Sequence, residues 1–117
     1  MPIGSPGNAV QPQAMLQAFL NVRVFGMTPQ EAVEAPRFAT FSFPRSSAPH
    51  SFSPGLLRLE ERMGRGVREA LGALGHDAQP CADWDFTLGG VCTIVRDRGG
   101  RLEGGSDPRR PTAVAGW

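Results

Sequence analysis

The chain has 117 residues and a formal net charge of +1, so it has the length of one small domain and no charge excess favouring nucleic acid or an acidic surface as partner. Its hydrophobic fraction of 40% and charged fraction of 20% are typical of a globular protein and exclude a disordered one. Glycine (15) and proline (11) exceed average usage, which predicts many turns and loops. We expect a single domain over residues 1–117.

The cysteines and histidines favour neither a disulfide framework nor a metal site. Cys81 and Cys92 are expected to be half-buried free thiols. His50 and His76 are far apart and have no further ligands at zinc spacing, so no metal and no cofactor is predicted. The chain contains no signal peptide and no apolar run long enough to span a bilayer, so no membrane partner is predicted and the localisation is unknown.

A glycine-rich turn, Gly4-Ser5-Pro6-Gly7-Asn8, opens the chain and precedes a helical pattern, with no strand expected before it. Glycines let the backbone approach a ligand closely, and a turn ahead of a helix presents free backbone N–H groups. Such groups bind oxyanions and carboxylates. The turn therefore predicts part of a binding site whose other part lies elsewhere.

Two helices are predicted next. The first covers residues 12–25, and its apolar spacing predicts a core-facing side formed by Met15, Leu16, Phe19 and Leu20. The second begins with a capping box at Thr28-Pro29-Gln30-Glu31 and ends before Pro36. A tight turn at Gly26 makes the two helices a hairpin, with Val33 directed toward the first helix.

The remaining residues are predicted to form strands with one more helix between them. Strands are expected at 37–43, 56–60, 78–81, 90–95 and 101–105, and a helix at 62–74 that Gly75-His76 closes. Asp97 to Gly100 has the composition of a hairpin turn. The order α-α-β-β-α-β-β-β is that of an α+β fold.

Several short motifs occur together in a recognisable order. They are Gly4–Asn8, Gln11-Pro12-Gln13, Leu20-Asn21, Phe25-Gly26-Met27, Gln30-Glu31-Ala32, Ala35–Phe38, Leu74-Gly75-His76, Trp84, Thr93–Arg96 and Asp107-Pro108-Arg109. The ordered set covers essentially the whole chain. It resembles the C-terminal part of the small subunit in the γ-glutamyltransferase (γ-glutamyltranspeptidase) family.

This resemblance implies part of the αββα sandwich of an N-terminal-nucleophile hydrolase that cleaves its own precursor. Cleavage exposes a threonine whose own amine can act as its base, and the enzyme transfers or hydrolyses γ-glutamyl groups, as in glutathione metabolism. In the family, two backbone N–H groups of the turn bind the tetrahedral oxyanion, and they correspond here to Gly7 and Asn8. The family's usual residue at the second position is glycine, but asparagine keeps the N–H and tolerates a left-handed backbone. Family members are often periplasmic or secreted.

The resemblance places the nucleophile and the substrate clamp upstream of this turn. The internal threonines do not match the nucleophile's motif; they are Thr28, Thr40, Thr87, Thr93 and Thr112. We therefore expect the chain to act with an upstream part of the same enzyme and to be inactive alone. Two alternatives remain: a freestanding inactive remnant, and a small-ligand or partner-binding module that reuses the anion-binding turn.

Without the upstream strands, the family fold would expose sheet edges and an apolar face. We therefore expect the isolated chain to self-associate; a monodisperse monomer in light scattering at micromolar concentration would contradict this.

Some charged and aromatic residues allow a functional and a structural interpretation. Asp107 and Arg109 are a substrate clamp or, more in keeping with their turn, a buried ion pair. Arg37 is expected to be a structural anchor, and His76 to cap a helix end. Trp84, between Asp83 and Asp85, is expected to pack against its surroundings rather than bind a ligand.

Overall fold

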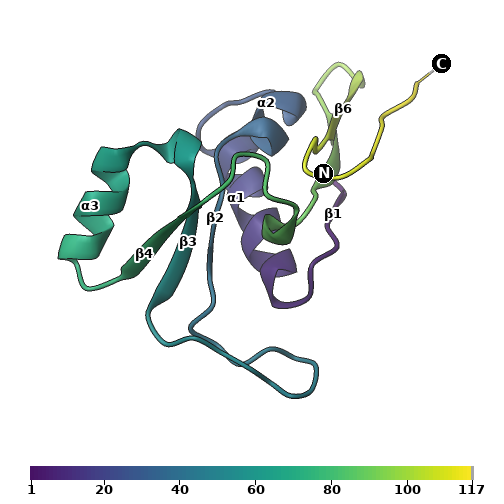
Figure 1. Ribbon diagram of the computed structural model, residues 1–117. Coiled ribbons are helices and arrows are strands. Elements are labelled where there is room, and N and C mark those ends of the chain that lie inside the picture. Colours follow the sequence, from purple (N-terminus) through teal and green to yellow (C-terminus); the bar gives the residue numbers. More distant parts are fainter. Residues whose placement is uncertain (117) are drawn as a thin grey trace.

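The structure, a computed structural model, describes residues 1–116 (Figure 1). The helices are α1 (Gln11–Arg23), α2 (Pro29–Glu34) and α3 (Arg65–Ala73). The strands are β1 (Ile3–Gly4), β2 (Phe38–Thr40), β3 (Leu56–Glu60), β4 (Asp77–Cys81), β5 (Cys92–Arg96) and β6 (Leu102–Ser106). The predicted order is confirmed with one correction: a short strand, β1, precedes the first helix. The strand expected at 37–43 ends earlier, at Thr40.

The strands form two three-stranded sheets. One has the order β1-β5-β6 and is antiparallel, and the other has the order β2-β3-β4, with β3 and β4 parallel. Helix α3 connects that parallel pair, and it lies with β4 and β3 on one side of Figure 1, apart from α1 and α2. Helix α2 packs so closely on β6 that a Cβ at Gly105 would fall on the carbonyl of Pro29, and only glycine allows this approach.

The helix ends follow the sequence signals. At the start of α2, Thr28 Oγ1 accepts from the backbone N–H of Glu31, and the Glu31 carboxylate accepts from the N–H of Thr28 at 2.8 Å, which confirms the capping box. Helix α3 ends at Ala73, and Gly75, two residues further on, has φ +96°. The backbone N–H of His76 donates to the carbonyl of Leu71 at 3.2 Å. Gly75-His76 thus closes the helix as predicted, through the backbone.

Two glutamines of α1 cover the outer edge of β2. Gln13 pairs with both backbone groups of Thr40, at 2.8 and 3.0 Å, and Gln17 pairs in the same way with Phe38, at 3.2 and 2.9 Å. Four residues of helix rise about 6 Å and two residues of strand about 6.6 Å, so the two side chains match alternate strand positions. This one edge is covered within the chain itself, while the self-association expected for the isolated chain stays a prediction.

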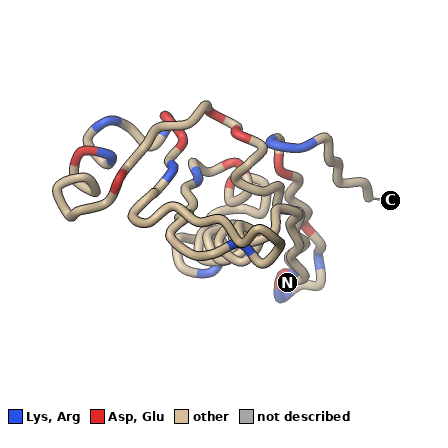
Figure 2. Tube along the Cα trace, turned by 60° about the horizontal axis from the view of Figure 1, so that its bottom comes forward, with Lys and Arg blue, Asp and Glu red and all other residues tan. Residues whose placement is uncertain are grey.

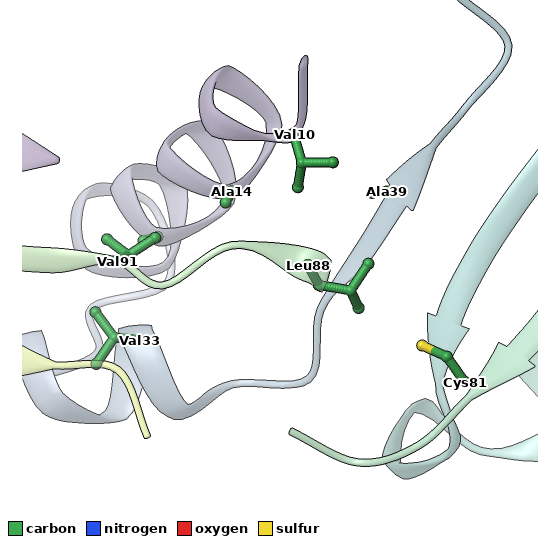
Figure 3. Close-up of a cluster of buried hydrophobic side chains, with 8 residues drawn as sticks. Val10, Ala14, Val33, Ala39, Cys81, Leu88 and Val91 are labelled. Carbon is green, nitrogen blue, oxygen red and sulfur yellow. The ribbon is translucent and has the colours of Figure 1, made fainter. Parts of the chain in front are cut away.

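The core lies between α1, α2, β2 and the segment leading into β5 (Figure 3). Its buried residues are Val10, Ala14, Ala18, Val33, Ala39, Cys81, Leu88 and Val91. Val33 is fully buried beside α1, as predicted. The buried side of α1, however, is formed by its alanines, and the face predicted to be buried is largely exposed: Leu16 is 57% exposed and Phe19 43%.

Helix α3 contributes no buried residue, and Leu74 at its end is 78% exposed. Acidic and basic residues are interspersed along the trace (Figure 2). No helix within residues 1–116 is long and apolar enough to cross a membrane.

Candidate functional site

The turn at Gly7 and Asn8 has an unusual backbone. Gly7 has φ +127° and Asn8 has φ +55°, a left-handed conformation that few residues other than glycine adopt. The carbonyl of Gly7 accepts from the N–H of Val10 at 3.0 Å and starts the helical turn that leads into α1. Within residues 1–116, the backbone N–H groups of Gly7 and Asn8 donate to no acceptor. The turn therefore offers two adjacent donors to a ligand.

Strand β1 fixes this turn to the rest of the fold. Ile3 and Gly4 pair with Thr93 and Cys92 of β5, and the hydroxyl of Ser5 accepts from the N–H of Gly90 at 3.1 Å. A donor pair held between a strand and a helix is more rigidly oriented than one on a free loop. Two residues are too short to give a strand periodicity, so the sequence carried no signal for β1.

The side chain of Asn8 binds the loop between β2 and β3. Its Nδ2 donates to Ser47 Oγ at 3.0 Å, and its Oδ1 accepts from Ser46 Oγ at 2.5 Å. These serines lie in the Ser/Pro-rich segment 44–54, whose composition is typical of a loop and does not indicate a contact partner. The family's usual residue at the position of Asn8 is glycine, so the presence of a polar side chain there was the one signal in the sequence that this position makes a contact.

The turn and this loop enclose a cavity of about 570 Å³. Among residues 1–116, it is lined by three arginines and by no aspartate or glutamate; the arginines are Arg45, Arg58 and Arg110. Its other lining residues include Gly7 and Asn8, the hydroxyl-bearing Thr40, Ser51, Ser53 and Thr87, and the aromatic Phe41, Phe43 and Phe52. A space of this size with convergent donors and apolar walls is typical of a small-molecule site.

The three arginines differ in how fully they are paired. Arg58 forms an ion pair with Asp85 at 3.2 Å. Arg110 donates to the carbonyl of Phe86 at 3.2 Å, while its buried Nε has no hydrogen-bond partner within residues 1–116. Neither Arg45 nor Arg110 has an acidic partner among the described residues. The cavity thus carries positive charge that an anionic ligand would neutralise.

The charged motif residues near the C-terminus form a separate buried network. Arg109 binds Glu60 in a bidentate pair, at 2.6 and 2.7 Å, and Arg37 binds Asp107 at 2.5 Å. Each of the four side chains is at most 4% exposed. The expectation of a buried ion pair at Asp107 and Arg109 and of a structural anchor at Arg37 is confirmed, and none of the four lines the cavity.

The network keeps its groups charged. Burial alone would raise the pKa of Glu60, but the hydrogen bond and positive charge of Arg109 outweigh it and hold that pKa below its usual range. Burial would also raise the pKa of Asp107, but the charge of Arg37 and the hydrogen bond from the N–H of Val91 outweigh it and hold that pKa below its usual range. The network therefore joins α2, β3 and the C-terminal segment through fully paired charges.

The remaining candidate residues have structural surroundings. Trp84 lies under the guanidinium of Arg62, 3.6 Å from the ring centre, so it packs as expected. Both thiols are free, but Cys81 is buried and Cys92 exposed, so neither is half-buried as predicted. Burial raises the pKa of Cys81 to about 11, with the charge of Asp85 adding to the effect. Residues 1–116 contain no group of three or more His, Cys, Asp or Glu side chains that could hold a metal ion.

Comparison with known proteins gives consistent matches over the whole chain. A family model described as gamma-glutamyltranspeptidase matches residues 1–117. The oxamate amidohydrolase proenzyme of Klebsiella pneumoniae is 35% identical over 117 residues, which are 100% of this chain and 21% of that protein. The glutathione hydrolase-like YwrD proenzyme of Bacillus subtilis is 30% identical over 113 residues, covering 97% of this chain and 20% of the relative. This chain therefore spans about a fifth of the length of both curated relatives.

A solved structure confirms the fold. The crystal structure of cephalosporin acylase from Bacillus halodurans superposes with a TM-score of 0.82 at 31% identity, over 99% of this chain and 20% of that one. With such neighbours, the α+β arrangement is part of the sandwich of the N-terminal-nucleophile hydrolases, as the sequence motifs implied.

Proposed function

This chain belongs to the γ-glutamyltranspeptidase family, and from that premise we propose that it is the C-terminal portion of an amidohydrolase or acyltransferase whose threonine nucleophile lies upstream. In this proposal the chain supplies the oxyanion hole. The observation that carries it is that Gly7 and Asn8 line a cavity and that their backbone N–H groups have no acceptor within residues 1–116.

The chemistry follows from what these donors can do. A threonine hydroxyl attacks the carbonyl carbon of an amide, the C=O π bond opens, and negative charge collects on the carbonyl oxygen. Two fixed N–H groups stabilise that charge in the tetrahedral intermediate more than they stabilise the neutral carbonyl. The threonine's own amine takes the hydroxyl proton during the attack and passes it to the nitrogen of the leaving amine as the C=O bond re-forms and the C–N bond breaks. Water or an amino acid then resolves the acyl-enzyme that remains.

For the substrate, we propose an amide whose acyl part is anionic. Arg45, Arg58 and Arg110 line the cavity without any lining carboxylate, which supports a negatively charged ligand. The curated relatives are named for oxamate and glutathione, and both of these molecules carry carboxylates. A γ-glutamyl group fits the same description.

We further propose that the upstream part of the same protein is the chain's partner. The exposed apolar residues of α1, Leu16 and Phe19, support a covered surface in the whole protein. The isolated chain should then hydrolyse no γ-glutamyl anilide, and turnover by the pure chain that a mutation within it abolishes would contradict the proposal.

The oxyanion role is tested by Gly7→Ala in the whole protein, with Gly26→Ala as matched control. Both glycines have positive φ, +127° and +70°, and a Cβ at either meets only ordinary contacts or open space. Both substitutions strain the backbone, but only the first turns a donor away from the cavity. We expect Gly7→Ala to lower kcat by about 100- to 1,000-fold, the usual effect of losing one such donor.

The control should keep kcat within about threefold of the unmodified protein. Its melting temperature should fall less than that of Gly7→Ala, because φ +70° lies near the left-handed region open to alanine and φ +127° does not. Equal kcat values for the two variants would overturn the proposed oxyanion hole.

A further inference from the structure

We propose that Ser46 and Ser47 are positioning residues for catalysis, which hold the side chain of Asn8 so that its backbone N–H stays directed at the reacting oxygen. This inference rests on the proposed function, because it assigns Asn8 the role of an oxyanion donor. It adds two serines some 38 and 39 residues away in sequence that act through Asn8 and touch no substrate.

The need for such support comes from the backbone of Asn8. Its φ of +55° is one that glycine adopts freely and a residue with a Cβ adopts at a cost. The two hydrogen bonds use both ends of the side-chain amide, at 3.0 and 2.5 Å, so they fix the plane of that amide and oppose rotation of the residue out of the left-handed region.

The loop that carries the serines is itself ordered by hydrogen bonds. The N–H of His50 donates to the carbonyl of Ser47 at 2.9 Å, and the N–H of Arg45 donates to the carbonyl of Ser51 at 3.1 Å. The loop therefore presents the two hydroxyls from a defined backbone.

The location of this contact argues against a role in the fold alone. Asn8, Ser46 and Ser47 are all exposed, so their polar atoms would be satisfied by water if the contact were broken. Hydrogen bonds between exposed groups contribute little to the stability of the whole fold, but they can still shift a local equilibrium between two backbone conformations severalfold. The same loop also lines the cavity through Arg45 and Phe52, so its position and that of the donor are linked.

The experiment is a mutant cycle in the whole protein, with kcat, KM and melting temperature measured on an amide substrate that it turns over. We expect the double variant S46A/S47A to lower kcat about tenfold, with KM changed less than twofold and the melting temperature unchanged. The variant S46T/S47T keeps both hydroxyls and should restore kcat. In an Asn8→Gly background, where no side chain remains to be held, S46A/S47A should have no further effect.

Three results would overturn the inference: kcat unchanged in S46A/S47A, an equal loss of kcat in the Asn8→Gly background, or a loss that S46T/S47T does not restore. The variant Gly7→Ala separates this failure from that of the proposed function. If Gly7→Ala lowers kcat and S46A/S47A does not, the oxyanion hole stands without the serines. If neither lowers kcat, the oxyanion hole itself is absent.

Discussion

The buried charge network and the turn at Gly7 and Asn8 are both built from short motifs, and they differ in how their hydrogen-bonding groups are used. In the network, Arg109 and Glu60 bind each other twice, and Asp107 accepts from Arg37, Val91 and Arg109. In the turn, two backbone donors have no acceptor within residues 1–116. One region is closed to ligands because its groups are already paired, and the other is open because its groups are not.

The comparison shows why a charged motif is a poor guide to a catalytic residue. Asp107 and Arg109 carry formal charges, but they are fully buried and every strong contact is internal. Gly7 carries no side chain, yet it lines a cavity and its backbone N–H has no acceptor within residues 1–116. Unsatisfied donors beside a cavity indicate chemistry more directly than charge does.

The largest expected effect comes from breaking the network. Arg109→Met leaves buried Glu60 without its bidentate partner and removes one of the two arginines that bind Asp107. We expect the free energy of unfolding in urea to fall by about 3–5 kcal/mol. The matched control is Arg101→Met, which removes an exposed pair with Glu103 and should cost less than about 1 kcal/mol.

Below the melting temperature, the whole protein carrying Arg109→Met should keep kcat within about threefold, because none of the four charged residues of the network lines the cavity. If it does not fold well enough to be measured, the more conservative Arg109→Lys tests the same point. A cost no larger than that of Arg101→Met would contradict the structural role of the network.

Lowering the pH is expected to reduce the free energy of unfolding by a smaller amount. The pKa values of Glu60 and Asp107 are lowered in the folded state, so their contribution to stability is complete above the unfolded values and is lost as the pH falls through the folded ones. The free energy of unfolding should therefore be flat between about pH 7 and pH 5 and decline below about pH 4.5.

The pair E60Q/D107N should weaken this acid dependence, whereas Glu69→Gln, which alters an exposed pair with Arg65, should leave it unchanged. Urea titrations at several pH values measure the acid dependence of the free energy of unfolding in each of these variants. An acid slope in E60Q/D107N as steep as that of the unmodified protein would show that other groups are responsible.

Most secondary structure was predictable because its signals are local. The capping box at Thr28, the glycine that ends α3 and the alternation of β3 each act over a few residues, and all three occur as expected. The buried side of α1 was predicted wrongly because hydrophobicity favoured Leu16 and Phe19, whereas close packing against α2 and β2 selected the small side chains of Ala14 and Ala18.

The contacts that shape the candidate site were not predictable because they join distant residues. The glutamines on the edge of β2, the bond from Ser5 to Gly90 and the serines on Asn8 link segments 21 to 85 residues apart. Nothing in the local pattern at either end specifies its partner. The turn itself was predictable, because its glycines and the helical pattern that follows are local signals; its role as an oxyanion hole stays a prediction.

The central claim is that the backbone N–H groups of Gly7 and Asn8 bind the oxyanion. A crystal structure of the whole protein with a covalent tetrahedral adduct on its nucleophile, formed by an aldehyde or boronate analogue of the substrate, tests it directly. The account predicts an adduct oxygen about 2.7–3.1 Å from both nitrogens. An adduct oxygen bound by other donors, with both N–H groups turned to solvent, would contradict it.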